Sequence, residues 1–343
     1  MKTIEQIHNL ILRRLLPLIL LGLALTGCRR DDPDTCIRDV ILRLQYNLDH
    51  YTDTILTTYA NWPAYAMRFI VDVYPDMNNP SIGDRIDRVV HVISGPAPGF
   101  HEEIISMQMP DRKVKLLIWA DFVQPAAQTD LYYTTTDLRN VRVISPSAYN
   151  SGIYPKDAFV ADTLLNPLQE SGNPAIFTVP IRTPFAKYKI ISGDVQKYLL
   201  TAGNPPINQL NAIVAYHYFF PIGYDVYTGD VNHLQAGIGY TLPLSQSEIH
   251  VNADSLVVAC DYVFVSKSSS GILQGGGTTV NYDALAEINL LIRNGGIITG
   301  LNNVPIRLKR GWMTLVRGDF LTTKSTDIGI DDNFDGEIII PIP

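Results

Sequence analysis

The chain has 343 residues, of which 46% are hydrophobic and 18% are charged, and its formal net charge is −7. This composition excludes disordered and fibrous proteins, and a chain of this length can form one large domain or two ordinary ones without disulfide support. No run of Lys or Arg is longer than a pair, so this acidic chain is not expected to bind nucleic acid.

The N-terminus has the architecture of a signal peptide. Arg13 and Arg14 precede an apolar run of eleven residues, Leu15 to Leu25, and small residues follow before Cys28. Such a run, rising about 1.5 Å per residue, is too short to cross about 30 Å of hydrocarbon as a permanent transmembrane helix. We predict that residues 1–27 are a signal peptide, with a buried helix as the alternative.

The sequence Leu25-Thr26-Gly27-Cys28 resembles the bacterial lipobox. The resemblance implies cleavage before Cys28 and acylation of its thiol, and two acyl chains give stable membrane anchoring. Residues 28–37 are then a lipidated tether, because Arg29 to Asp34 is charged and has no apolar periodicity. Asp31-Asp32 resembles the acidic signal that accompanies surface display in the Bacteroidetes, and an ordinary solvated linker is the alternative. We therefore expect a lipid anchor in the outer membrane and exposure at the cell surface.

Most of the remaining chain alternates apolar and polar residues with the period of two that is typical of half-buried strands. Clusters of Gly, Pro, Asn and Asp separate these runs, and helices long enough for βαβ units are missing, so the predicted fold class is all-β sandwich. One short helix is expected at Asp194 to Thr201, with Asp194 as its N-cap and Gly203 beyond its end. The strand-like runs include Val40-Leu42-Leu44-Tyr46, Met67-Phe69-Val71-Val73, Val114-Leu116-Ile118-Ala120, Phe177-Val179-Ile181, Ala186-Tyr188-Ile190, Leu256-Val258-Cys260-Tyr262-Phe264, Ile288-Leu290-Ile292 and Thr314 to Thr322.

A cluster of Pro, Gly, Ser and Asn at Asn166 to Pro174 separates two strand-rich halves. We place the domain boundary there. This gives an N-terminal β-sandwich domain at 38–170 and a C-terminal β-sandwich domain at 171–343, both of ordinary domain size.

Two cysteines remain once Cys28 is assigned to lipid. Cys36 and Cys260 could form a disulfide in the oxidising cell envelope. Cys260 lies inside a strand-like run, which favours a small buried side chain with a free thiol.

Several strand segments together resemble a known family. These segments are Lys115 to Val123, Asp130 to Tyr133, Asp157-Ala158-Phe159, Ile181 to Tyr188, Asp261 to Val265, Val304 to Arg310 and Arg317 to Thr322. They resemble the fimbrillin-like lipoproteins of the Bacteroidetes, a superfamily of fimbrial subunits and anchors. The resemblance runs from about residue 38 to the end, and it departs where the usual Arg-Pro reads Arg182-Thr183-Pro184. It implies two tandem transthyretin-like β-sandwich domains, no enzymatic activity, no cofactor, and other fimbrial subunits as partners.

Subunits of such pili join by strand exchange, in which an extended segment of one subunit adds to a sheet of its neighbour. Only 21 residues follow Thr322, which leaves little chain for a donor strand and favours a fimbrial anchor or accessory subunit. A polymerising stalk subunit is one alternative, and the resemblance then implies an arginine-specific cut at Arg38 or Arg43. A surface lipoprotein that binds host or bacterial glycans is another, because aromatic clusters at Tyr132-Tyr133 and Tyr216 to Phe220 could line a sugar site.

Three short motifs match known sites in part. Asp162-Thr163-Leu164 resembles the O-glycosylation acceptor of the Bacteroidetes, with Thr163 as the modified residue. Asp331 to Gly336 matches half of an EF-hand loop, but Ile342 stands where the calcium-binding Glu belongs, so we expect a polar turn. Arg317-Gly318-Asp319 matches an integrin-binding tripeptide but lies in a predicted strand. No metal-ligand spacing, nucleophile elbow or phosphate loop is present, so we predict no metal site and no enzyme.

Overall fold

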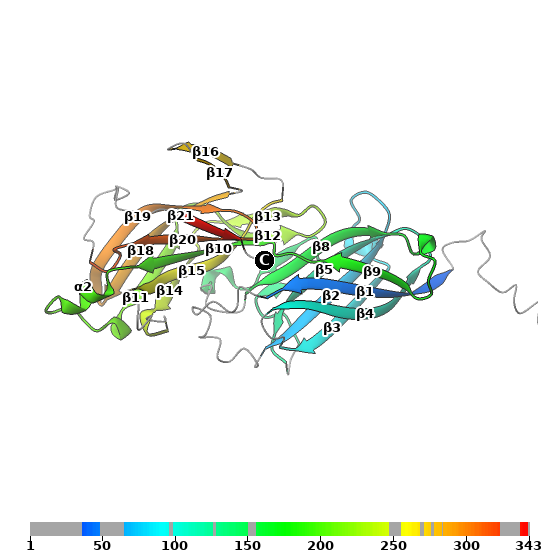
Figure 1. Cartoon of the computed structure of the whole chain (residues 1–343), viewed down its shortest axis with the longest axis horizontal. Helices are drawn as coiled ribbons and strands as arrows, with labels where there is room; N and C mark the ends of the chain where they lie inside the picture. The colour runs from blue at the N-terminus through cyan, green and yellow to red at the C-terminus, as the bar shows by residue number, and fades with distance from the viewer. Residues whose placement is uncertain are drawn as a thin grey trace, which may run out of the picture.

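The computed structural model describes residues 36–48, 65–95, 99–125, 128–149, 156–246, 255–267, 271–275, 278–282, 284–322 and 337–341. Its strands form two β-sandwiches that follow one another along the long axis of the molecule (Figure 1). This confirms the all-β class that the alternating sequence predicts. The helices among the described residues are α2 (Val195–Leu200) and the 3₁₀ turns η3 (Ile82–Asp84), η4 (Pro146–Ala148), η5 (Pro167–Gln169), η6 (Ile207–Gln209) and η7 (Leu244–Gln246).

The first sandwich consists of two sheets, with strand orders β4-β1-β9 and β3-β2-β5-β8. β1 pairs antiparallel with β4 along its whole length and parallel with β9 from Val40 to Gln45. β1 is therefore the central strand of its sheet. The bounds are β1 (Ile37–Asn47), β2 (Ala66–Pro75), β3 (Asp87–Ser94), β4 (Phe100–Pro110), β5 (Val114–Val123), β8 (Ala158–Leu165) and β9 (Ala175–Pro180).

The core of the first sandwich follows the predicted alternation. Val40, Leu42, Leu44 and Tyr46 of β1 are buried, and the residues between them are partly exposed. These side chains pack in one cluster with inward residues of β2, β4, β5 and β8. β2 and β5 are buried along almost their whole length, so both faces of these strands are covered.

The second sandwich consists of sheets β15-β10-β20-β21 and β14-β11-β18-β19. Tyr188, Val214, Leu290 and Ile306 belong to the buried cluster between these sheets. The bounds are β10 (Phe185–Ser192), β11 (Asn211–Tyr216), β14 (Gly239–Pro243), β15 (Leu256–Phe264), β18 (Ala284–Asn294), β19 (Gly296–Leu308), β20 (Trp312–Gly318) and β21 (Glu337–Pro341). The hairpin β16 (Gly271–Gly275) and β17 (Thr278–Tyr282) forms a separate two-stranded sheet.

A further small sheet joins the two halves of the chain. β7 (Val141–Val143) comes from the first half but pairs with β12 (Phe220–Asp225) of the second. β6 (Tyr133–Thr134) and β13 (Asp230–Gln235) complete the order β13-β12-β7-β6. Backbone hydrogen bonds therefore connect the two sandwiches.

The strand pairing places the crossover between sandwiches later in the chain than our boundary between residues 170 and 171. β9 follows that boundary, yet it belongs to the first sandwich because it pairs with β1. The crossover is the segment 181–184, directly before β10. Pro, Gly and Asn at 166–174 mark a loop between β8 and β9, and such residues do not indicate which sheet the next strand joins.

The short helix is present as α2, but Asp194 has a different role from the predicted one. Asp194 occupies the N-cap position without a side-chain capping bond. Its carboxylate instead accepts hydrogen bonds from Ser192 Oγ at 2.5 Å and from the backbone N–H groups of Leu321 and Thr322 at 3.3 and 2.6 Å. Asp194 thus holds the chain that follows β20 against the end of β10.

Replacing Asp194 with Ala should lower the free energy of unfolding by about 3 kcal/mol, because buried N–H groups lose a charged acceptor. Urea unfolding of the full chain measures this effect. Asp319→Ala is the matched control, since the Asp319 side chain is 53% exposed and pairs with Lys197 at 3.7 Å. The control should change stability by at most about 0.5 kcal/mol. Equal losses of stability in both variants would contradict the role of Asp194 in holding the chain that follows β20.

Candidate functional site

Aromatic side chains cover the faces of β5 and β10 where the two sandwiches meet. Trp119 of β5 packs edge-on against Tyr133, with ring centroids 5.4 Å apart. Phe185 of β10 stacks on Phe264 at 4.4 Å, and Phe264 stacks on Tyr224 at 5.4 Å. All five side chains are buried in one cluster with Ile70 and Leu117. This cluster explains why β2 and β5 are buried on both faces.

A buried ion pair crosses the same interface. Lys156 Nζ lies 2.9 Å from Asp261 Oδ1, and both side chains are almost fully buried. The Tyr216 hydroxyl donates to Asp261 Oδ2 at 2.8 Å, and the backbone N–H of Tyr262 donates to Oδ1 at 2.8 Å. Burial raises the pKa of Asp261 and lowers the pKa of Lys156, while the charge of each partner opposes the shift of the other. A pair with this many partners is suited to holding the halves together.

The aromatic cluster that we considered as a sugar site is divided by the fold. Tyr216 and Phe220 are buried, and the Tyr216 hydroxyl lies 2.9 Å from that of Tyr188. Burial raises the pKa of both tyrosines well above the usual range, so these hydroxyls stay neutral. Tyr218 and Phe219 are exposed between β11 and β12. Tyr216 therefore belongs to the core and does not line a surface site.

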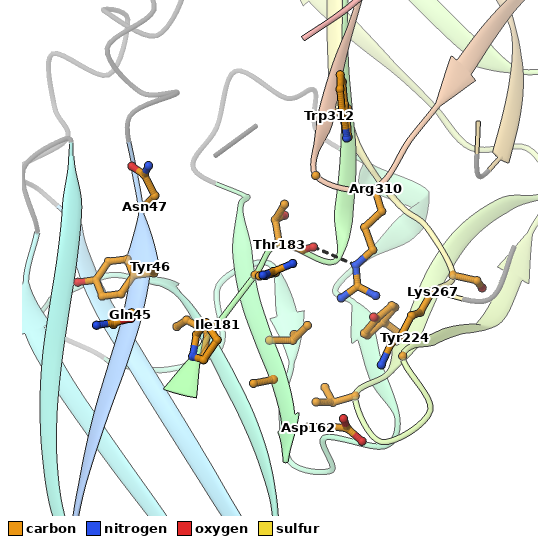
Figure 2. A pocket seen from close by; sticks show the side chains of 18 of the residues that line it. Gln45, Tyr46, Asn47, Asp162, Ile181, Thr183, Tyr224, Lys267, Arg310 and Trp312 are labelled. Carbon is orange, nitrogen blue, oxygen red and sulfur yellow. Dashed lines mark hydrogen bonds between the residues drawn. The ribbon is translucent and has the colours of Figure 1, made fainter. Parts of the chain in front are cut away.

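A groove with a volume of about 810 Å³ opens beside the interface. Figure 2 shows Gln45, Tyr46 and Asn47 at the end of β1 on one side. Tyr224, Lys267 and Arg310 of the second sandwich lie opposite, and Ile181 and Thr183 of the crossover lie between the two walls (Figure 2). Small-molecule sites commonly have volumes of 300–1,000 Å³ and often lie between domains.

Arg310 is fixed where the crossover meets the second sandwich. Its Nε donates to the backbone carbonyl of Thr183 at 3.1 Å. Its guanidinium carbon lies 5.7 Å from the centre of the Tyr224 ring, within the range of a cation–π contact. Burial raises the pKa of Tyr224 to about 12, although the charge of Arg310 opposes this shift. Arg310 is thus a positioned cation in the groove wall.

The part of the groove lining that the structure describes is cationic overall. Its charged lining residues are Arg182, Lys267, Arg310 and Asp162. Asp162 Oδ2 lies 2.5 Å from Lys115 Nζ, so this carboxylate already has a partner. Three positive charges therefore lie around a groove of a chain whose formal net charge is −7.

Backbone pairing is largely complete around the groove. The backbone N–H of Ile181 donates to the carbonyl of Gln45 at 2.9 Å, directly where β1 enters the groove. Val160 of β8 and Arg182 exchange two backbone hydrogen bonds of 2.8 and 3.0 Å. Side chains rather than strand edges therefore form most of the lining.

Arg38 and Arg43, the predicted maturation sites, both lie inside β1. The Arg38 guanidinium donates to three backbone carbonyls in the segment 167–172 and lies 3.5 Å from Asp111. Arg43 Nε lies 3.9 Å from Glu102 on β4. Both arginines are parts of the folded sheet.

The remaining predicted site residues do not line the groove, or they lie outside the residues that the structure describes. Thr163 is half-buried in the edge strand β8, and its glycosylation stays a prediction. Arg317 and Gly318 end β20, but Asp319 lies beyond the strand and is exposed, so the tripeptide is only partly in the predicted strand. Cys28 and the EF-hand-like segment 331–336 lie outside the described residues.

Cys260 does not pair with Cys36. It is a free thiol inside β15, and burial raises its pKa to about 11. Among the described residues, no cluster of three or more His, Cys, Asp or Glu side chains is placed to hold a metal ion. In the same part of the chain, no helix is both long and apolar enough to cross a membrane.

A family of unknown function, DUF6562, matches residues 35–343 of this sequence. The chain belongs to the DUF6562 family. No curated protein sequence matches it. The solved structures that are similar to this DUF6562 chain include three proteins of the Bacteroidetes. A candidate cell adhesion protein from Bacteroides eggerthii is 13% identical, with a TM-score of 0.44, over 89% of this chain and 95% of that chain.

Two of these structures are fimbrial proteins from Porphyromonas gingivalis. The fimbrial anchor protein Mfa2 is 12% identical, with a TM-score of 0.37, over 82% of this chain and 91% of that chain. The tip fimbrial protein Mfa3, with a C-terminal truncation, is 10% identical, with a TM-score of 0.41, over 88% of this chain and 99% of that chain. These similarities are too remote to transfer the role of any residue.

Sequence analysis of the DUF6562 chain missed Lys156, Asp261 and Arg310. Asp261 could have been identified from the sequence as a buried charge, because it is the one charged residue in the apolar run Leu256 to Phe264. A carboxylate in a fully buried strand requires a cationic partner. Lys156 lies 105 residues away, so the sequence does not identify it as that partner.

Lys156→Met should destabilise the DUF6562 chain by about 3–5 kcal/mol at pH 7, because Asp261 keeps a buried charge without its cation. The loss relative to the unmodified chain should shrink as the pH falls, since the raised pKa of Asp261 lets it protonate in the folded variant. Urea unfolding at pH 7 and pH 5 measures the loss of stability and its change with pH. Lys156→Met with Asp261→Asn should recover much of the loss. An identical loss at both pH values, or no recovery, would contradict a buried ion pair.

Proposed function

We propose that this chain is a non-enzymatic lipoprotein of the outer-membrane surface that acts as a fimbrial anchor or accessory subunit. In this proposal Cys28 carries the lipid, and neighbouring subunits join by β-strand addition. The observation that carries the proposal is the position of β1, which is paired on both sides in the first sandwich.

Retention of β1 favours an anchor over a stalk subunit. Arg38 and Arg43 are the only Lys or Arg residues between positions 31 and 67. Cleavage at either one requires an extended, accessible backbone, but Arg43 is paired with both β4 and β9, and Arg38 is paired with β4. The side chain of Arg38 is in addition held by carbonyls of the segment 167–172. A chain that is cut at neither Arg38 nor Arg43 keeps all of β1, as the proposed anchor role requires.

The C-terminal strand supports the same role. β21 pairs antiparallel with β20, with Pro341 opposite Trp312 and Glu337 opposite Val316. It therefore completes a sheet of its own chain. A strand used in this way is not available for donation to a neighbour unless it leaves β20. The chain is therefore better suited to accept a strand than to donate one.

β4 is the edge that we expect to accept a neighbour's strand. Within the described residues its one sheet neighbour is β1, and it is eleven residues long. Phe100 and Ile104 on its outer face are 63% and 53% exposed. A long exposed edge with apolar side chains is a template for strand addition.

Ile104→Lys should reduce incorporation of the chain into surface fibres several-fold, because a charge on an edge strand opposes strand addition. Fibres sheared from cells and quantified by immunoblot measure incorporation. Leu168→Lys is the matched control, since Leu168 is similarly exposed at 63% but lies in η5. Equal incorporation of both variants would contradict the role of β4, and the thermal midpoint of each variant verifies that it folds.

Mass spectrometry of the N-terminal peptide, from protein recovered from native membranes, tests the anchor role directly. We expect an acylated Cys28 and an intact β1, and Cys28→Ser should release the protein from the membrane. A new N-terminus directly after Arg38 or Arg43 would identify a stalk subunit and overturn the anchor proposal. An unacylated Cys28, free or in a disulfide, would overturn the lipid attachment.

A further inference from the structure

The groove between the two sandwiches concentrates positive charge. Arg182, Lys267 and Arg310 line it, and its carboxylate Asp162 already pairs with Lys115 at 2.5 Å. We propose that this groove binds an acidic oligosaccharide through the carboxylate or sulfate groups of the sugar. This site goes beyond the proposed fimbrial role, since strand addition at β4 does not require a ligand in the groove.

Two of the three cations that line the groove have no carboxylate partner among the described residues. In the part of the chain that the structure describes, neither Arg182 nor Lys267 forms an ion pair, and both side chains are exposed. Arg310 is held by the carbonyl of Thr183 and lies against Tyr224, so its position is set before any ligand arrives. Like charges gathered around one concave surface repel one another, and an anion relieves that repulsion. The guanidinium group is shaped to bind carboxylate and sulfate oxygens in pairs.

The rest of the lining suits a sugar. The exposed ring of Phe100 and the partly buried ring of Trp312 lie among the amide side chains of Gln45 and Asn47. A sugar unit has an apolar face of C–H groups that packs on an aromatic ring, and hydroxyl groups that exchange hydrogen bonds with amides. The volume of about 810 Å³ lies within the range of small-ligand sites and accommodates a short oligosaccharide.

The backbone around the groove disfavours a peptide strand as the occupant. β1 has β4 on one side and β9 on the other, and the carbonyl of Gln45 accepts from Ile181. Val160 already pairs with Arg182 in the crossover. Strand addition needs a run of unpaired N–H and C=O groups, whereas this lining offers mainly side chains.

Isothermal titration of the purified full chain in detergent tests the site. The acidic probes are a chondroitin sulfate tetrasaccharide and tetragalacturonate, and the neutral probe is chitotetraose. We expect an acidic probe to bind, more weakly as salt rises, and the neutral probe not to bind. The double variant Arg182→Ala with Lys267→Ala should weaken binding about tenfold or more, because each lost cation removes a charge-assisted contact.

A matched double variant separates the groove from general charge effects. Lys113→Ala with Lys197→Ala also removes two cations, and both lysines are exposed, with surface partners Asp76 and Asp319. This control should bind the acidic probe as the unmodified chain does. The proposal is overturned if neither acidic probe binds at millimolar concentration, if chitotetraose binds equally well, or if both double variants lose affinity alike. None of these results affects the N-terminal peptide or fibre incorporation, so the anchor role is judged separately.

Discussion

A buried charge needs a partner, and in this protein the partner comes from the other half of the chain. Asp261 lies in the second sandwich, and Lys156, directly before β8 of the first, lies 2.9 Å away. Separating the sandwiches would break this ion pair and deprive each group of its partner. The aromatic cluster around Trp119 and the shared sheet of β7 and β12 add to this constraint. The groove depends on these contacts too, because its two walls belong to different halves of the chain and the contacts keep their spacing.

Much of the fold could be predicted from side-chain alternation, because a strand with one buried face has an apolar residue at every second position. The runs at Val40 to Tyr46 and at Val114 to Ala120 became β1 and β5. β6 and β7 have only two and three residues, which is too short for a period to show. The pairing of β9 with β1 joins residues more than 130 positions apart, and no local pattern specifies it.

The functional surface was harder to predict for the same physical reason. The groove draws Gln45, Arg182, Lys267 and Arg310 from four distant segments, and each reads locally as an ordinary surface residue. Asp194 shows the opposite case, in which a local pattern suggested a helix cap. The carboxylate instead binds backbone groups more than 120 positions later. Local chemistry indicates what a side chain can do, and the long-range fold decides which partner it meets.

The parallel pairing of β1 with β9 determines how the first sandwich carries mechanical load. The chain enters β1 at Ile37 and leaves β9 at Pro180 toward the second sandwich. A pull between the residues before β1 and the second sandwich therefore draws the two strands past each other along their length. In this shear direction all six register pairs, from Val40 and Ala175 to Gln45 and Pro180, resist together. Had β9 run antiparallel to β1, the same pull would have opened the ladder one pair at a time, at a much lower force.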